Sequence, residues 1–164
     1  MSFGGCNRAP IIGFGADTVV LPSGTCTLTL AGSGEDSDKT GDLDIRNSMI
    51  IGTNGTMPPI VTGDPNWTDR IFHILIGTVT IKGIVIRGGW EADAGGGAVR
   101  IESGASLIMN HSQVADSFAI GMYGGGICNN SVSISSESGH LYAAENSRAQ
   151  HAGDGAPVPR HCAG

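Results

Sequence analysis

The chain repeats itself at an interval of about 28 residues, and this repeat restricts its fold more than any other feature of the sequence. Val79 corresponds to Leu107 at that interval, and Ile81 corresponds to Met109. A period between about 20 and 50 residues is typical of solenoids, in which each repeat packs only against its neighbours. The interval therefore predicts that successive repeats stack with these apolar side chains directly above one another.

Each repeat contains two short strands followed by a glycine-rich corner. Val79 and Ile81 alternate with polar residues at a period of two, and Ile84 and Ile86 do the same after a one-residue shift at Gly83. Such a shift is expected of a bend that turns the chain while both apolar pairs still point inward. A run of three glycines then begins the third side, because glycine accepts backbone angles that a branched residue cannot. The two triple-glycine segments are 95–97 and 124–126, which lie 29 positions apart.

The length of the repeat predicts an all-β, right-handed parallel β-helix, a solenoid of about five coils. Leucine-rich repeat spacing is absent, and a propeller blade needs about 40 residues. Glycine makes up 27 of the 164 residues, and Val, Ile and Thr recur in short bursts between turn-forming residues. We expect an N-terminal cap segment at 1–16, the β-helix at 17–135 and an atypical C-terminal tail or cap at 136–164, where the alternation ends.

Charge and hydropathy argue against two classes of partner. The sequence contains nine Lys and Arg residues and 15 Asp and Glu residues, and it has no basic stripe. Nucleic acid is therefore not expected to bind. The longest apolar runs, such as 71–76, are too short to cross a bilayer. The start of the sequence lacks a basic segment followed by an apolar stretch, so no secretion signal is visible.

The four cysteines leave the redox compartment open. None belongs to a C-x-x-C pair, so a cysteine-based zinc site has little support. A Cys6–Cys26 bridge that closes the N-terminal end and buried free thiols are two interpretations that both fit the sequence. The cysteines are Cys6, Cys26, Cys128 and Cys162.

The sequence resembles bacterial right-handed parallel β-helix repeat proteins of the pectate-lyase-like superfamily, of the extracellular type that starts with a cysteine-containing segment. The similar segments are 15–25, 40–45, 69–74, 79–88 and the two triple-glycine segments, within a stretch of about 15–135. The resemblance implies the fold and an extracellular or cell-surface location. It does not imply one activity, because β-helices include lyases, hydrolases, adhesins and inert stalks. The chain differs in having few coils and an atypical tail. We interpret the tail as a foreign or out-of-frame end, and the alternatives are a C-terminal cap or a disordered tail.

An acidic stretch at 35–44 contains five carboxylates. Oxygen ligands at this density are typical of Ca²⁺ sites, so Asp36, Asp38, Asp42 and Asp44 are candidate calcium ligands. The stretch lacks the spacing of an EF-hand, and a solvated loop between coils is the alternative interpretation.

Asp64, Asp69 and Arg70 are candidate catalytic residues. A β-helix lyase needs a base such as arginine and calcium-bound carboxylates, and an inverting hydrolase needs two carboxylates about 6.5–9.5 Å apart. Arg70, Arg87 and Arg100 are expected to form a rank along one side of the solenoid. The alternative is a charged pair at a strand edge.

Trp67 and Trp90 lie in predicted loops beside the same coils. Loop aromatics next to Asn, Asp and Thr are suited to stacking on sugar rings, so these two residues, with Arg87 and Arg100, are candidate glycan-binding residues. The alternative is that each Trp covers the edge of the core. His73 is expected to pack within a strand.

Two functions compete for this sequence. The first is a secreted or surface module without catalytic activity, whose loops bind carbohydrate or protein. The second is a small polysaccharide lyase or glycoside hydrolase that acts on acidic polysaccharide, with help from calcium. Ice binding comes last, because threonines do not recur at one position in successive coils. Open coil ends and strand edges also predict a homodimer.

Overall fold

The protein is an all-β solenoid. The computed structural model describes residues 16–34, 36–37, 39–92, 94–120, 124–130, 134–136 and 142–143. These residues form sixteen strands and no helix, so the described part of the chain contains no helix that could cross a membrane.

Three parallel sheets form the sides of the solenoid, and a short strand pair lies at one corner. The first sheet contains β1 (Asp17–Val20), β4 (Met49–Gly52), β7 (Gly77–Lys82), β11 (Ala105–Asn110) and β15 (Ile134–Ser136). The second contains β2 (Thr25–Leu28), β5 (Ile60–Gly63), β8 (Val85–Arg87), β12 (Gln113–Ala115) and β16 (Tyr142–Ala143). The third contains β3 (Leu43–Ile45), β6 (Phe72–Ile74), β10 (Val99–Ile101) and β14 (Ile127–Asn129), and the corner pair is β9 (Trp90–Glu91) with β13 (Phe118–Ala119).

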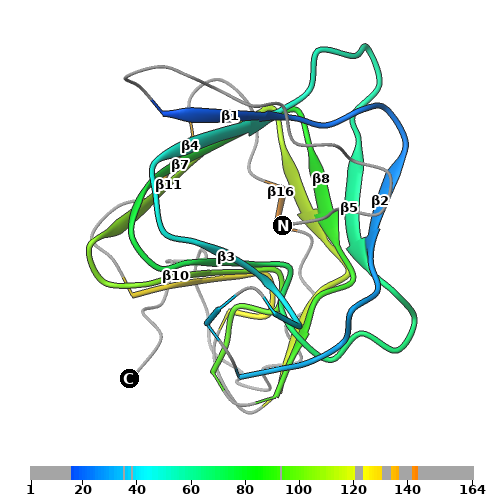
Figure 1. Ribbon diagram of the computed structural model, residues 1–164, viewed down its shortest axis with the longest axis vertical. Coiled ribbons are helices and arrows are strands. Elements are labelled where there is room, and N and C mark those ends of the chain that lie inside the picture. The colour runs from blue at the N-terminus through cyan, green and yellow to red at the C-terminus, as the bar shows by residue number, and fades with distance from the viewer. Residues whose placement is uncertain are drawn as a thin grey trace, which may run out of the picture.

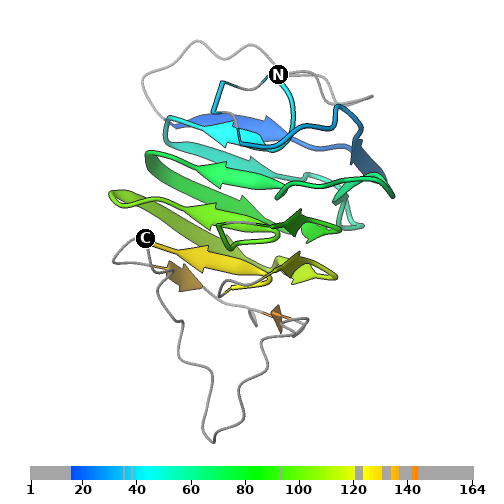
Figure 2. The same cartoon turned by 90° about the horizontal axis from the view of Figure 1, so that it is seen from below.

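The chain passes from the first sheet to the second and then to the third before it begins the next turn. Figure 1 looks down the solenoid, and in it the path from β1 through β2 to β3 runs clockwise. Figure 2 shows the turns stacked in sequence order from the N-terminal turn. The winding is right-handed, as parallel crossovers almost always are. The β-helix predicted from the repeat is confirmed, with about four turns and the first strands of another.

The core is a column of aliphatic side chains from successive turns. Leu107 pairs in register with Val79, and Met109 pairs with Ile81. All four side chains are at most 2% exposed. The stacking predicted from the repeat interval is therefore confirmed for β7 and β11. Burial of this column is the main favourable term in folding, because no single turn could bury its apolar face alone.

Cys26 and Cys128 are buried, and both belong to disulfides. The interpretation of buried free thiols is therefore wrong for these two cysteines, although their burial was expected. A disulfide reduces the conformational entropy of the unfolded chain, which favours the folded state. Cys6 and Cys162 lie outside the described residues.

The two predicted end segments fall mostly outside the described residues. The strand β16 lies within the segment assigned to the tail, and its residues pair with Gln113 and Val114 of β12. The second sheet thus continues into the segment that was assigned to the tail.

Candidate ligand groove and candidate metal centre

A cavity of about 510 Å³, here called the corner groove, lies beside the second sheet and the corner pair. Two sets of side chains line it, one from the sheet strands and one from the corner and its flanking loops. The groove is open to solvent, unlike the enclosed clefts that hold most small-molecule ligands. The residues used below are Thr27, Thr62, Asp64, Trp67, Arg87, Trp90, Asp116 and Phe118.

Thr27, Thr62 and Arg87 form one rank of the groove. They are register partners in β2, β5 and β8, and neighbouring strands lie about 4.8 Å apart. The rank therefore crosses three successive turns along the solenoid axis. Arg87 is exposed, and no carboxylate of the described residues forms an ion pair with it. The guanidinium can therefore bind an anionic group of a ligand.

Trp90 and Phe118 form the aromatic rank of the groove. They are register partners in β9 and β13, so one ring lies on each of two successive turns. Trp90 is half-buried, and Phe118 is 38% exposed. Phe118 was not among the predicted binding residues, although it lies 28 positions after Trp90, which is the repeat interval and could have identified it.

Trp67 is part of the groove wall and packs into the core. Its side chain is 6% exposed, and its Nε1 donates a hydrogen bond to the carbonyl oxygen of Arg70 at 3.1 Å. A Cβ added at Gly63 would lie 2.2 Å from Cγ of Trp67, so only glycine leaves room for this ring. Trp67 therefore supports the wall of the groove, and the more accessible aromatic rings in the groove are those of Trp90 and Phe118.

The three candidate catalytic residues do not meet in the groove. Asp64 lines it, and its Oδ1 accepts a hydrogen bond from the backbone N–H of Asn66 at 2.8 Å. Asp69 and Arg70 are 2% and 8% exposed and do not line the groove. Asp64 therefore lies at the groove, whereas the Asp69 carboxylate and the Arg70 guanidinium are buried away from it.

Asp69 and Arg70 belong to a buried ionic cluster that joins three turns. Arg70 Nε lies 3.5 Å from Asp42 Oδ2 and 3.8 Å from Asp69 Oδ1, and Arg70 Nη2 pairs with Glu91 Oε2. The backbone N–H groups of Asp42 and Arg70 donate to the Asp69 carboxylate at 3.2 and 2.8 Å. Every member is buried, and the contacts link residues of three successive turns.

The ionic cluster contains three carboxylates and one guanidinium among the described residues. Burial, followed by the neighbouring Asp69 charge, raises the pKa of Asp42 to about 8. Burial also raises the pKa of Asp69, although hydrogen bonds and the Arg70 charge oppose that shift. We therefore expect the cluster to hold a proton at neutral pH, because one guanidinium cannot balance three buried charges.

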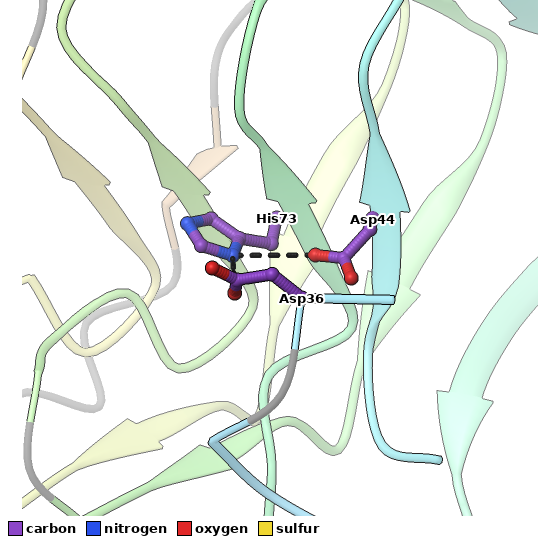
Figure 3. A group of neighbouring side chains, drawn as sticks. All are labelled: Asp36, Asp44 and His73. Atoms are coloured by element: carbon purple, nitrogen blue, oxygen red, sulfur yellow. Dashed lines mark ion pairs between the residues drawn. The ribbon is translucent and has the colours of Figure 1, made fainter. Parts of the chain in front are cut away.

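A second polar cluster lies on the third sheet (Figure 3). Asp44 on β3 and His73 on β6 are register partners, and Asp36 comes from the loop before β3. His73 Nδ1 lies 3.4 Å from Oδ1 of Asp36 and 3.4 Å from Oδ1 of Asp44. The side chains of Asp44 and His73 are 0% and 7% exposed, whereas that of Asp36 is 60% exposed. One imidazole nitrogen and two carboxylate oxygens, all within 4.8 Å of one another, form a candidate metal centre.

The other ring nitrogen of His73 faces Glu102. His73 Nε2 lies 3.0 Å from Glu102 Oε1, and Arg100 Nε donates to the same oxygen. Burial alone would raise the pKa of Glu102, but the hydrogen bonds from His73 and Arg100 outweigh burial and lower that pKa. Glu102 is therefore ionised at neutral pH and orients the imidazole.

The structure does not form the predicted rank of arginines. Arg87 is on the second sheet, Arg100 is the register partner of His73 on the third, and Arg70 is in the ionic cluster. Arg100 also donates from Nη1 to the carbonyl oxygen of Ala94 at 2.6 Å, so it does not share the corner groove with Arg87. The expectation failed because Arg87 lies on the second sheet, Arg100 lies on the third, and Arg70 lies in the turn before β6.

The four aspartates proposed as calcium ligands are also divided. Asp42 faces Arg70 in the ionic cluster, and Asp44 faces His73. Asp38 lies outside the described residues. Asp36 and Asp44 do come together, but with a histidine that the sequence analysis assigned to packing. The missed signal is the spacing of Asp44 and His73, which corresponds to one turn of the solenoid.

Comparison with models of protein families, with curated proteins and with solved structures finds no match for this chain.

Proposed function

We propose that the protein is a β-helix module without catalytic activity that binds a carbohydrate chain in its corner groove. The observation that most supports this proposal is the pairing of Trp90 with Phe118 on successive turns. The apolar face of a sugar ring stacks on an aromatic side chain, and a rank of two rings offers consecutive positions along one ligand. The solenoid holds both rings on strands, which are more rigid than loops.

Polar side chains beside the aromatic rank supply the hydrogen bonds that a sugar needs. Thr27 and Thr62 offer hydroxyl groups, and Asp64 and Asp116 offer carboxylates. Arg87 offers a planar guanidinium, which binds carboxylate or sulfate groups in a bidentate manner. We therefore propose a glycan that includes acidic sugars, with Arg87 next to the acidic group.

The alternative function, a lyase or hydrolase of acidic polysaccharide, has weaker support from the geometry. Asp64 lines the corner groove, but Asp69 and Arg70 are buried in the ionic cluster. A general acid or base must lie within hydrogen-bond reach of the bond that it cleaves. Incubation with polygalacturonate or alginate, with and without Ca²⁺, tests the alternative through the absorbance of unsaturated products and the yield of reducing ends.

A glycan array followed by calorimetry with the best acidic oligosaccharide tests the binding proposal. We expect Trp90→Ala to weaken binding at least tenfold, because aromatic stacking supplies much of the contact. We expect Arg87→Gln to weaken acidic ligands more than neutral ones. Ile76→Ala and Lys82→Gln are matched controls, since both residues are exposed and neither lines the groove. Unchanged affinity in Trp90→Ala, or turnover of the polymer, would contradict the proposal.

The resemblance to pectate-lyase-like β-helix proteins extends this proposal to location and assembly. We propose that the module belongs to that superfamily and works outside the cell or at its surface. We also propose a homodimer through a coil end, because β1 is the terminal strand of the first sheet among the described strands. Light scattering that finds only monomer would contradict the dimer and leave the groove proposal unaffected.

A further inference from the structure

We propose that Asp36, Asp44 and His73 bind a divalent transition-metal ion, of which zinc is the representative. The ion would join the loop before β3 to the first two strands of the third sheet. This proposal does not rest on the proposed function, because the three residues lie on the third sheet and its preceding loop and none of them lines the corner groove.

Two of the three distances between the donor atoms match the geometry of a tetrahedral site, and the third, between the Asp36 and Asp44 oxygens, is at most 4.8 Å. Zinc lies about 2.1 Å from nitrogen and oxygen ligands, and at the tetrahedral angle two such ligands are about 3.4 Å apart. His73 Nδ1 is 3.4 Å from the nearest oxygen of Asp36 and 3.4 Å from that of Asp44. This separation is longer than the usual range of about 2.7–3.2 Å for a direct N–H···O hydrogen bond. An ion at the common centre thus fits the spacing better than a direct contact does.

The position of Glu102 prepares the imidazole for this role. Its carboxylate is 3.0 Å from His73 Nε2, and an ionised carboxylate accepts a hydrogen bond from an N–H group at that nitrogen. With the proton on Nε2, the lone pair of Nδ1 points toward Asp36 and Asp44. A carboxylate that orients a metal-bound histidine in this way is a regular feature of zinc sites. Glu102 is therefore a positioning residue in this proposal.

The chemistry of the donors selects the class of metal. Ca²⁺ and Mg²⁺ take oxygen ligands, whereas imidazole nitrogen favours zinc and its transition-metal neighbours. Three protein ligands leave one tetrahedral position for water or for a group of a ligand. Asp36 is the exposed member, so the ion has a path into the site from solvent.

Titration of the full chain with ZnCl₂ after removal of metal by a chelator tests the proposal. We expect one zinc ion per chain that depends on His73, and weaker binding of Ca²⁺ than of Zn²⁺. Because other histidines can also bind zinc, the total amount of bound metal does not by itself show that the ion occupies the proposed site. The other histidines that could compete for zinc are His111 and, outside the described residues, His140, His151 and His161.

Three variants assign the ion to the proposed residues. We expect His73→Ala to lose one equivalent of zinc, and Asp36→Asn and Asp44→Asn to raise the Kd for zinc at least tenfold. His111→Asn is the matched control, because His111 is exposed and has a φ of 49°, which asparagine tolerates.

A substitution at the buried residues Asp44 or His73 could prevent folding. The Asp36 side chain is 60% exposed, so Asp36→Asn should fold and still tests the proposal. Nitrogen-15 spectra of the histidine rings provide an independent readout, with Nδ1 of His73 expected to shift on addition of zinc. Equal zinc affinity and stoichiometry in Asp36→Asn and wild type, or no shift of His73 Nδ1, would overturn the proposal.

Discussion

Asp44 on β3 and His73 on β6 occupy the same position in successive turns, so that a carboxylate oxygen lies 3.4 Å from an imidazole nitrogen on a nearly buried face. The register of the third sheet brings together two residues that are far apart in the sequence. The same stacking places Glu102 on the far side of the imidazole.

Glu102→Gln should weaken zinc binding by about ten- to a hundredfold, as changes to residues that orient a metal ligand commonly do. The amide keeps the shape of the side chain but does not hold the proton on His73 Nε2 as strongly. Calorimetry on metal-free protein measures the effect. A thermal melt of the metal-free variant serves as the control for folding. Equal affinity of variant and wild type would contradict the positioning role.

The stability of the protein should fall as the pH rises from about 4 to about 8. The pKa of Asp42 is raised from 3.8 to about 8 in the folded state, so in this range the folded chain keeps a proton that the unfolded chain releases. When the unfolded state binds fewer protons, the free energy of unfolding decreases with pH. Urea unfolding at several pH values measures this slope.

Asp42→Asn should make that slope smaller, because the amide does not titrate. Asp116→Asn is the matched control, since Asp116 is exposed and its φ of 44° suits asparagine. The same slope in Asp42→Asn and in wild type would show that another group causes the pH dependence.

Arg70→Met should destabilise the fold by about 3–5 kcal/mol, which is typical when one partner of a buried ion pair is removed. Asp42, Asp69 and Glu91 would then be buried without the guanidinium that faces them. Chemical unfolding measures the loss. Arg87→Met is the control, because this exposed arginine should change stability by less than about 0.5 kcal/mol. Equal effects in the two variants would contradict the structural role of the ionic cluster.

Gly63→Ala should cost about 1–3 kcal/mol, the usual range for overpacking. The added Cβ would lie 2.2 Å from Trp67 Cγ, so the indole ring has to move. Gly52→Ala is the control, because the contact there is 3.4 Å from Lys82 Cβ. Thermal melts of both variants, with Trp fluorescence as a second probe, distinguish displacement of Trp67 from a general loss of stability.

The regular repeat interval was sufficient to predict the stacking in the later turns but not in the earlier ones. Thr25 pairs with Ile60, a longer interval than that of the repeat, and Ile60 pairs with Val85 after a shorter one. The strands must stay in register because they bury the core, whereas the loops between them change length at small entropic cost. A repeat in the sequence is therefore visible only where successive loops have similar lengths.

The candidate sites were predicted in part. Trp90 and Arg87 do line one groove, although Trp90 lies on the strand β9 and not in the predicted loop. Asp69 and Arg70 were predicted to be catalytic residues or a charged pair at a strand edge, whereas both are buried. Their burial depends on Glu91 from the next turn, and a partner at that distance has no local signal in the sequence.

Fluorescence of Trp90 tests the central claim, carbohydrate binding in the corner groove, most directly. The Trp67→Phe variant leaves Trp90 as its one indole, because the chain has two tryptophans. We predict that titration with an acidic oligosaccharide changes the Trp90 emission in a saturable way, and that Arg87→Gln in the same background shifts the curve at least tenfold toward weaker binding. A flat emission signal at ligand concentrations that saturate binding by calorimetry would place the ligand elsewhere and contradict the account.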